Sequence, residues 1–369
     1  MRILLVQDYL RAGGTEQHSL FLAEAFSQRG HDVTLLNFRP GGSLEPKKSK
    51  LSYRRIVLQK KDWKTSWFAP GWRKVISALK PDAVLLYGRN AHRLGGPIKS
   101  EYPKIKVIAS LRTGRRLPPY YIDSLESSDG ITVNSAYARD RLVDLKLAFE
   151  LPVRLIPNPL LKQATTDAIQ SERKKFREFH KIPEGHRVFL QVASLIPGKN
   201  HREMLHLLAK IKAEKDWTLW IVGNGPAEKR IQSAVRHLGL TDRVKLWGFQ
   251  RNPMPFYAAA DIFLTTSVEE SLPNAVIEGQ ACGLPVVAYL TAGLPECVQD
   301  GVTGILSKQG DGEAWLAALK EVSNWLIKDK KGLGEKCRNY AFQEFSPDPL
   351  IERYLLFIEE VVQRRWSQG

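Results

Sequence analysis

Short apolar runs rich in β-branched residues alternate with amphipathic stretches along the whole of this sequence. Parallel α/β sheets produce this alternation, because each buried strand is joined to the next by a helix that covers one face of the sheet. The sequence therefore predicts an α/β protein with two doubly wound, Rossmann-like sheets. The expected strands lie at 3–6, 32–36, 55–58, 83–87, 106–110, 130–133 and 153–156 in a first series, and at 188–192, 217–222, 244–246, 262–265, 285–288 and 303–306 in a second. The clearest expected helices lie at 15–28, 136–148, 202–213, 227–238, 311–326 and 349–364.

The length of the chain and one proline-rich break predict two domains. At 369 residues the chain exceeds what one ordinary hydrophobic core holds. Residues 156–159, Ile-Pro-Asn-Pro, interrupt the regular pattern and are typical of a linker. We expect an N-terminal domain over 1–160 and a C-terminal domain over 161–348, facing each other across a central cleft. The last helix is long enough to cross back, so that residues of about 349–369 complete the N-terminal domain.

The composition narrows the class of protein. Apolar residues make up 43% of the chain and charged residues 25%, as in an ordinary folded globular protein. No apolar run approaches the roughly 18 residues of a membrane-spanning helix, and the opening MRILLVQDY is predicted to be a strand rather than a signal peptide. The cysteines number 3, an odd count without metal-type spacing, which favours free thiols in a reducing compartment. We therefore expect a cytoplasmic location.

The net charge of +16 is concentrated in the first half of the chain. Residues 1–160 hold 27 Lys and Arg against 14 Asp and Glu, whereas residues 161–369 hold 28 against 25. Basic residues mixed with aromatic ones suit an anionic membrane surface, which predicts peripheral contact of the N-terminal domain with the inner face of the cell membrane. Nucleic acid is not expected, because no nucleic-acid motif accompanies the charge, and a basic surface without a partner is the remaining alternative. The residues concerned are Lys47, Lys48, Lys50, Arg54, Arg55, Lys60, Lys61, Lys64, Arg73 and Lys74, interleaved with Trp63, Trp67, Phe68 and Trp72.

Two carboxylates bracket a predicted helix start in the second half. Glu270 and Glu278 lie in SVEESLPNAVIEGQACGLPVVA, where Pro273 suits the first turn of a helix over 274–282 and Gly283 suits its end. A helix N-terminus attracts phosphate or sugar oxygens, and a carboxylate accepts hydrogen bonds from ribose hydroxyls. The segment therefore predicts a site for a phosphorylated, hydroxyl-rich ligand.

Further loops follow expected strands, where ligands bind in open α/β sheets. Gly13 and Gly14 precede a helix and would let backbone amides approach a phosphate, although an ordinary turn gives the same pattern. Lys199, at an expected helix start, is unfavourable with the helix dipole and so suits a contact with a diphosphate. Gly248, in WGFQ, would let backbone atoms meet a nucleobase. Neither a GxGxxG motif nor a P-loop is present.

Taken together, these segments resemble the family 4 glycosyltransferases, which are retaining enzymes with the GT-B architecture. The resemblance covers nearly the whole chain and is more specific in the C-terminal half. It includes AGGTEQHSLFLAEAFSQRGHDV, ITVNSAYARDRL, IPNP, VASLIPGKNH, IVGNGP, VKLWGFQ, AAADIFLTTSVEESLPNAVIEGQACGLPVVA and GLPECVQDGVTGIL.

The resemblance implies a role for each matching residue. Gly14 would place its amide near the distal phosphate of a nucleotide-sugar donor, and Lys199 would neutralise the diphosphate. Glu278 would accept hydrogen bonds from the ribose hydroxyls, while Glu270 would lie beside the donor sugar. The other donor contacts would be the amides in the segment of Ser271, Leu272, Pro273 and Asn274, which would hold sugar hydroxyls, and the backbone of Gly248, Phe249 and Gln250, which would face the base.

Two positions depart from the family pattern. Ser194 stands where the family usually has an Arg beside the lysine, so one positive charge is missing from the donor site. Either Lys199 would carry more of its task, or a nearby Arg such as Arg202 would help. Arg112 stands where the family often has a His close to the reacting sugar. Together with Arg115 and Arg116, it would suit an acidic acceptor or the leaving phosphate.

The leading hypothesis is a retaining glycosyltransferase that moves a sugar from a nucleotide-diphosphate sugar to an acceptor hydroxyl. Its acceptor would be a glycan or a lipid-linked molecule, in the synthesis of a cell-envelope glycan, lipopolysaccharide or exopolysaccharide. Glu270, Lys199 and Arg112 are the candidate catalytic residues. The resemblance implies a reaction without a cofactor or a metal, and the sequence agrees, since it contains neither an Asp-x-Asp pair nor a metal-type cluster. A nucleotide-sugar epimerase of the same fold and a non-catalytic nucleotide-sugar-binding protein are the alternatives.

Overall fold

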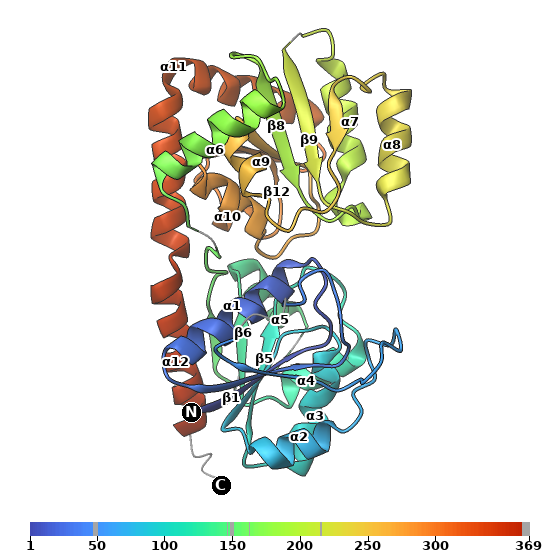
Figure 1. Ribbon diagram of the computed structural model, residues 1–369, viewed down its shortest axis with the longest axis vertical. Coiled ribbons are helices and arrows are strands. Elements are labelled where there is room, and N and C mark those ends of the chain that lie inside the picture. Colours follow the sequence, from blue (N-terminus) through green and yellow to red (C-terminus); the bar gives the residue numbers. More distant parts are fainter. Residues whose placement is uncertain (47–50, 146, 148–150, 162, 215, 364–369) are drawn as a thin grey trace. The chain divides into compact units, whose positions relative to one another are not determined.

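The chain forms two compact units, each built on a parallel sheet with helices around it (Figure 1). The computed structural model describes residues 1–46, 51–145, 147, 151–161, 163–214 and 216–363. The N-terminal unit consists of Met1–Leu161 and Pro347–Gly369, and the C-terminal unit of Lys162–Ser346. Within the described residues, no helix has both the length and the apolar character needed to cross a membrane.

The N-terminal unit holds a seven-stranded sheet in the order β3-β2-β1-β4-β5-β6-β7. Its inner strands are almost wholly apolar and buried, because helices cover both faces of such a sheet. The strand order reverses between β1 and β4, the kind of switch point at which open sheets bind ligands. The strands are β1 (Arg2–Gln7), β2 (Asp32–Asn37), β3 (Arg54–Val57), β4 (Ala83–Leu86), β5 (Lys106–Leu111), β6 (Gly130–Val133) and β7 (Val153–Leu155); the helices are α1 (Gly14–Gln28), α2 (Trp72–Leu79), the 3₁₀ turn η1 (Ala91–Leu94), α3 (Gly95–Glu101), α4 (Pro119–Glu126) and α5 (Ala136–Asp144).

The last helix of the chain, α12 (Pro347–Gln363), belongs to the N-terminal unit. It contacts α1 and β5, and it buries Tyr354, Phe357 and Ile358 in the same cluster as Phe26 of α1. The predicted return of the C-terminal helix to the first domain is confirmed.

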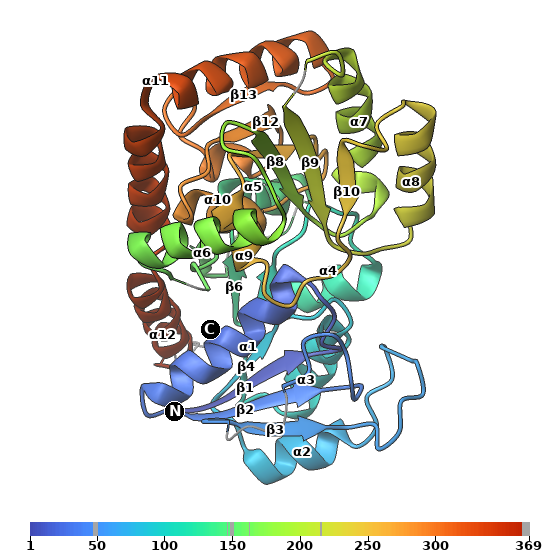
Figure 2. The same cartoon turned by 45° about the horizontal axis from the view of Figure 1, so that its top comes forward.

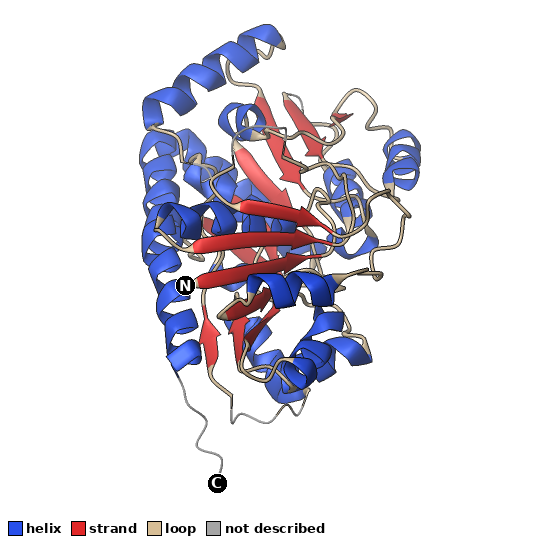
Figure 3. Cartoon of the chain, turned by 60° about the horizontal axis from the view of Figure 1, so that its bottom comes forward, coloured by secondary structure: helices blue, strands red, loops and turns tan. Residues whose placement is uncertain are grey.

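The C-terminal unit holds a six-stranded sheet in the order β10-β9-β8-β11-β12-β13, and Figure 2 shows β8, β9 and β10 side by side. All of its pairings are parallel, and its switch point lies between β8 and β11. The strands, red in Figure 3, are β8 (Arg187–Val192), β9 (Trp217–Val222), β10 (Val244–Leu246), β11 (Ile262–Thr265), β12 (Val286–Leu290) and β13 (Gly304–Lys308). The helices are α6 (Thr166–Phe179), α7 (His201–Lys210), α8 (Glu228–His237), α9 (Met254–Ala259), α10 (Asn274–Ala281) and α11 (Gly312–Phe345), with 3₁₀ turns η2 (Pro197–Lys199) and η3 (Leu294–Glu296).

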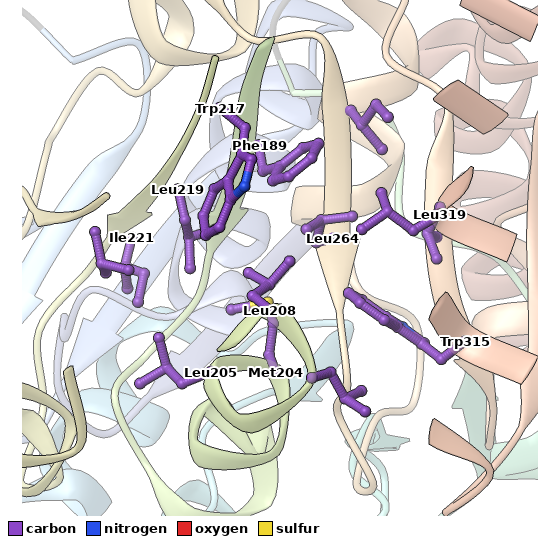
Figure 4. Close-up of a cluster of buried hydrophobic side chains, with 14 of the residues drawn as sticks. Phe189, Met204, Leu205, Leu208, Trp217, Leu219, Ile221, Leu264, Trp315 and Leu319 are labelled. Carbon is purple, nitrogen blue, oxygen red and sulfur yellow. The ribbon is translucent and has the colours of Figure 1, made fainter. Parts of the chain in front are cut away.

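A continuous apolar core fixes the C-terminal sheet against its helices. Phe189 of β8 stacks on Trp217 of β9 at 5.7 Å between ring centroids, and Trp315 of α11 is fully buried opposite them (Figure 4). Met204 and Leu208 of α7 fill the space between these aromatic rings. Because this core lies below the carboxyl ends of β8 and β11, the loops that follow these strands start from rigid positions.

Helix lengths are where the structure departs from the sequence-based expectation. α11 runs from Gly312 to Phe345, whereas the apolar period predicts a helix only over 311–326. A non-helical Asp329, with φ −155° and ψ 79°, kinks it, and this kink breaks the period on which the prediction relied. The helix expected over 136–148 ends at Asp144, and its expected last residue lies outside the described residues.

A buried carboxylate fastens several elements of the C-terminal unit together. Asp261, only 7% exposed, precedes β11 and forms ion pairs with Arg173 at 2.6 Å and Lys330 at 2.8 Å. It also accepts a hydrogen bond from the backbone N–H of Val188 at 2.8 Å. Burial alone would raise the pKa of Asp261, but the neighbouring cations, Arg173 first, lower it to about 2. The cluster thus joins α6, α11 and β8 through one side chain.

We expect Asp261→Asn to destabilise the C-terminal unit by about 3 kcal/mol at pH 7, because it leaves Arg173 and Arg177, whose side chains are 24% and 12% exposed, without their counterion. The folded pKa of about 2 lies below the ordinary 3.8, so the stabilising contribution is present above pH 4 and is lost as pH falls from about 4 to 2. Urea unfolding at pH 7 and at pH 3 measures this. The difference in the free energy of unfolding between wild type and variant should shrink at the lower pH. Asp242→Asn, at an exposed loop position, should have the same free energy of unfolding as wild type. A gap that does not depend on pH would contradict this account.

Candidate functional site

The loops after β8 and β11 lie on either side of the switch point of the C-terminal sheet, and hydrogen bonds join them. The N–H of Val268 donates to the carbonyl of Gly198 at 3.0 Å. The hydroxyl of Thr266 donates to the carbonyl of Asn200 at 2.9 Å. These bonds fix the turn that carries Lys199 beside the loop that carries Glu270, so two of the predicted site residues are brought together.

Lys199 and Glu270 form an ion pair, with side chains that are 18% and 12% exposed. The next residue but one, His201, is buried, and its Nε2 has no hydrogen-bond partner among the described residues. Burial and the nearby charge of Lys199 lower the pKa of His201 to about 4, so this imidazole is neutral at pH 7. Lys199 is therefore a cation that this part of the site offers to an anionic ligand, and in this structure its side chain pairs with Glu270.

The turn after β9 supports the loop after β8. The N–H of Leu195 donates to the carbonyl of Asn224 at 2.9 Å, and a Cβ at Gly225 would lie 2.4 Å from the carbonyl oxygen of Leu195. The N–H of Gly223 donates to the carbonyl of Gly248 at 2.8 Å, which extends the chain of contacts to the loop after β10. The two glycines of this turn let three neighbouring loops pack closely. Ser194, which precedes Leu195, is exposed there.

The predicted base-binding segment, from Gly248 to Gln250, forms a turn in which the Gln250 side chain bonds back to the backbone of Trp247. Gly248 has φ 67° with no atom near its missing side chain, so glycine is required there for conformation rather than for space. The side-chain amide of Gln250 donates to the carbonyl of Trp247 at 2.9 Å. Phe249 lies between them and is partly exposed.

The loop after β12 holds the segment that runs from Ser271 to Asn274. The hydroxyl of Thr291 donates to the carbonyl of Ser267 at 3.1 Å. A Cβ at Gly293 would lie 1.5 Å from the carbonyl oxygen of Ser271, so a residue with a side chain does not fit without a shift of the backbone. Pro273 is the N-cap of α10, which begins at Asn274 as the sequence predicts. Leu272, within this segment, is buried.

A tyrosine that the sequence did not single out holds Glu278. The hydroxyl of Tyr257, on α9, donates to Oε2 of Glu278 at 2.9 Å. Tyr257 is 2% exposed, and burial together with the charge of Glu278 raises its pKa well above the ordinary value. Tyr257 thus stays protonated and remains a donor. The only signal for it in the sequence is an aromatic residue in an apolar stretch, which also fits an ordinary core position.

The switch point of the N-terminal sheet carries a polar cluster beside the start of α1. Asp8, fully buried, accepts hydrogen bonds from Arg11 at 3.4 Å and from Asn90 at 3.1 Å. Glu16, on the first turn of α1, also pairs with Arg11, and burial raises its pKa. A Cβ at Gly13 would lie 2.2 Å from Oε2 of Glu16, so this glycine makes room for the carboxylate. Gly14 follows as the first residue of α1.

Arg112, the third catalytic candidate, directly follows β5 and is held by two protein partners. Its Nη1 donates to the hydroxyl of Tyr354 on α12 at 3.2 Å, and its Nη2 donates to Oδ1 of Asn158. Asn158 lies in the segment that leads out of the N-terminal unit, and α12 leads back into it. The structure therefore places Arg112 between the end of the first segment of the N-terminal unit and α12, and a role in catalysis stays a prediction.

The candidate residues thus fall into two groups. Gly14 and Arg112 lie in the N-terminal unit, and all the others lie at the carboxyl edge of the C-terminal sheet or on α10. Within the part of the chain that the structure describes, no three His, Cys, Asp or Glu side chains gather in a way that suits a metal ion. Independence of metals and cofactors stays a prediction.

Sequence comparisons find relatives of one kind. A sequence model described as glycosyl transferases group 1 matches residues 172–344, and one described as glycosyltransferase family 4 matches residues 12–160. The lipopolysaccharide core biosynthesis glycosyltransferase LpsE of Rhizobium meliloti is 24% identical over 356 residues, which cover 93% of this chain and 95% of LpsE. The N-acetyl-alpha-D-glucosaminyl L-malate synthase of Bacillus anthracis is 28% identical over 185 residues, which cover 49% of this chain and 48% of that protein.

Solved structures share the fold along the whole chain. HepE of Anabaena, crystallised with UDP, has a TM-score of 0.78 at 20% identity, and the match covers 98% of this chain and 100% of HepE. WaaG, a glycosyltransferase involved in lipopolysaccharide biosynthesis, has a TM-score of 0.76 at 15% identity, with 100% of both chains covered.

Two Rossmann-like units, with a last helix that packs on the first of them, define the GT-B class of sugar transferases. The two sequence models together match most of the chain, on both units. The chain belongs to the family 4 glycosyltransferases and is an enzyme of the hexosyltransferase type. The fold and family predicted from the sequence are confirmed, and none of the relatives named here supports an epimerase or a binding protein without turnover.

Proposed function

We propose that the carboxyl edge of the C-terminal sheet binds a nucleoside diphosphate sugar, and that the N-terminal unit binds the acceptor. The joined loops around the switch point between β8 and β11 carry this proposal, because they place a cation, a helix N-terminus and a positioned carboxylate on one edge of one sheet. HepE, which shares the fold, was crystallised with UDP-glucose. We therefore infer that uridine is the base to test first.

Loss of the nucleoside diphosphate is the difficult step of the reaction. Lys199 would neutralise negative charge on the departing diphosphate, and the amide of Gly14 would contact its distal phosphate. Glu278 would hold the ribose, and the backbone from Gly248 to Gln250 would face the base. Glu270 and the segment from Ser271 to Asn274 would orient the sugar hydroxyls. The acceptor hydroxyl would attack from the same face as the leaving group, which retains the anomeric configuration without a cofactor or a metal ion.

Cell-envelope polysaccharide is the proposed setting of this reaction. LpsE of Rhizobium meliloti, which is similar along nearly the whole chain, is a lipopolysaccharide core biosynthesis glycosyltransferase. A putative colanic acid biosynthesis glycosyltransferase, WcaL of Salmonella typhimurium, is 30% identical over 181 residues, which cover 47% of this chain and 45% of WcaL. A glycan or lipid-linked acceptor would bring the enzyme to the cytoplasmic face of the membrane, where the excess of basic residues in the N-terminal half favours contact with anionic lipid.

Glu278→Ala should raise the donor KM by about tenfold to a hundredfold, because removing a charged hydrogen-bond acceptor costs about 1.5–3 kcal/mol. Tyr257→Phe should raise it less, by about threefold to tenfold, since the carboxylate remains but loses the bond that orients it. Both variants should change kcat less than KM, because ribose contacts are made in the ground state as well as in the transition state. Initial rates at varied UDP-sugar concentration measure both.

A matched control is Tyr289→Phe, whose hydroxyl donates at 3.2 Å to Glu203 on α7 of the same unit rather than to Glu278 on α10. It should leave the donor KM unchanged. A wild-type donor KM for Glu278→Ala would refute the ribose assignment, and equal effects of Tyr257→Phe and Tyr289→Phe would refute a specific role of Tyr257.

A further inference from the structure

The loop between β3 and α2 has a defined fold of its own, and Figure 2 shows it projecting from the N-terminal sheet. The side-chain amide of Gln59, 1% exposed, donates to the carbonyl oxygens of Thr65 and Phe68, each at 2.7 Å. Arg39 clamps the same loop through two hydrogen bonds of 2.9 Å to Asp62. Residues 58–71, which we call the aromatic loop, are therefore held in one conformation.

Three large aromatic side chains of the aromatic loop are exposed to solvent. Trp63 is 50% exposed, Trp67 59% and Phe68 40%. Phe68 stacks on Trp63 at 5.5 Å between ring centroids and contacts Trp67 at 5.8 Å, so the three rings form one apolar patch. Trp72, which the sequence analysis grouped with them, is the first residue of α2, is 8% exposed and packs in the core with Ile76, so its inclusion was wrong. Keeping three such rings in water is unfavourable, and a patch of this kind marks an interaction site.

The charges around the patch are positive. Lys60, Lys61 and Lys64 are exposed on the same loop. Its acidic residue, Asp62, is already paired with Arg39. Aromatic rings beside exposed lysines match the boundary of an anionic bilayer, where the rings enter the headgroup region and the ammonium groups meet lipid phosphates. The expected basic residues Lys47, Lys48 and Lys50 lie outside the described residues.

Hydrogen bonds connect the aromatic loop to the polar cluster at the start of α1. The hydroxyl of Ser66 accepts from Arg11 at 3.2 Å and from Arg39 at 3.0 Å. Arg11 is the residue that pairs with Asp8 and Glu16 at the switch point of the N-terminal sheet. The aromatic loop is thus hydrogen-bonded to the loop at the switch point of the N-terminal sheet, in the unit that we propose to bind the acceptor.

We propose that the aromatic loop docks the enzyme on an anionic lipid surface by inserting Trp63, Trp67 and Phe68, and so brings the loop of Asp8, Arg11 and Glu16 next to the bilayer. The proposal rests on the proposed function, since a lipid-linked acceptor presents its reacting hydroxyl at the headgroups. It names one loop as the docking element rather than the basic unit as a whole.

The test is co-sedimentation of the full chain with vesicles of phosphatidylglycerol and phosphatidylcholine, against vesicles of phosphatidylcholine alone. We expect binding to the anionic vesicles that weakens as salt rises. The triple variant Trp63→Ser, Trp67→Ser, Phe68→Ser should bind at least about tenfold more weakly, and so should Lys60→Gln, Lys61→Gln, Lys64→Gln. Lipids with brominated acyl chains should quench tryptophan fluorescence in the wild type, and the quenching should be lost in Trp63→Phe, Trp67→Phe.

Two matched controls lie in the C-terminal unit. Phe179→Ser removes an aromatic ring that is 81% exposed, and Lys174→Gln, Lys175→Gln, Lys229→Gln removes three exposed lysines. Neither should weaken vesicle binding. Undiminished binding by the serine variant would overturn the proposal, as would binding to a DNA oligonucleotide in place of vesicles. A thermal shift with UDP, which does not involve lipid, reports separately on the donor site, so its failure would count against the proposed function and not against docking.

Discussion

Replacement of Lys199 by Ala is expected to lower kcat/KM by about a hundredfold to a thousandfold, the loss typical of removing one group that stabilises developing negative charge. Two observations, one from the sequence and one from the structure, lead us to expect so large an effect at Lys199. The family that the sequence resembles usually places an Arg at the position of Ser194, so the proposed diphosphate site of this chain has one cation fewer. His201, the first residue of α7, is neutral at pH 7 because its pKa is lowered to about 4.

The ion pair with Glu270 adds a further expectation. Lys199→Ala leaves Glu270 without its cation at the proposed sugar site, so part of the loss should come from an uncompensated carboxylate. The double variant Lys199→Ala, Glu270→Gln should therefore lose less activity than the sum of the two single losses in free energy. Lys199→Arg keeps the charge and should keep more activity than Lys199→Ala.

A second lysine of the same unit provides the matched control for Lys199. Lys210, at the end of α7, forms an ion pair with Glu313, and both side chains are largely exposed. Such an exposed ion pair contributes little to the free energy of unfolding. Lys210→Ala should show wild-type kcat/KM and unfolding temperature. If Lys199→Ala behaved like Lys210→Ala, the assignment of the diphosphate site would fail.

The sequence predicted those parts of the site that depend on local pattern. Lys199, Glu270 and Glu278 follow strands that short apolar runs reveal, and parallel strands of one sheet deliver their following loops to one edge. The start of α10 was predictable from Pro273, because proline fits a helix start and its effect is local. Knowing that two loops lie at the same edge of the sheet does not say which of their side chains touch. The ion pair between Lys199 and Glu270 is therefore seen only in the structure.

The residues that sequence reasoning missed are those whose role depends on a distant partner. Tyr257 has the pattern of a core residue, and only the fold brings its hydroxyl, on α9, to Glu278 on α10. Trp72 was misassigned because it was grouped with its neighbours by composition. Its spacing from Ile76 and Leu79 has a helical period, which would have indicated the buried face of α2.

Gly293→Ala is the second change with a large expected effect, and it tests the geometry of the sugar site rather than its charge. The new Cβ would lie 1.5 Å from the carbonyl oxygen and 2.6 Å from the carbonyl carbon of Ser271. Real side chains never approach backbone atoms so closely, so the segment from Ser271 to Asn274 or the loop after β12 must move. Because a displacement of about 1 Å in a positioning loop can reduce the rate about a hundredfold, we expect a loss of that size in kcat/KM.

The effect of Gly293→Ala should be local and selective for the sugar. Tyr257 still holds Glu278, and Lys199 lies on another loop, so the affinity for UDP should change by less than about threefold while turnover of the UDP-sugar falls. Gly334→Ala is the control, because its nearest neighbour, the carbonyl oxygen of Gly283, lies at an ordinary 3.5 Å and the residue is helical. Steady-state rates measure turnover, UDP titration measures nucleotide affinity, and the unfolding temperature shows whether a variant is merely destabilised. Wild-type turnover in Gly293→Ala would show that the segment from Ser271 to Asn274 does not position the sugar, and an equal loss of UDP affinity would place that segment at the nucleotide instead.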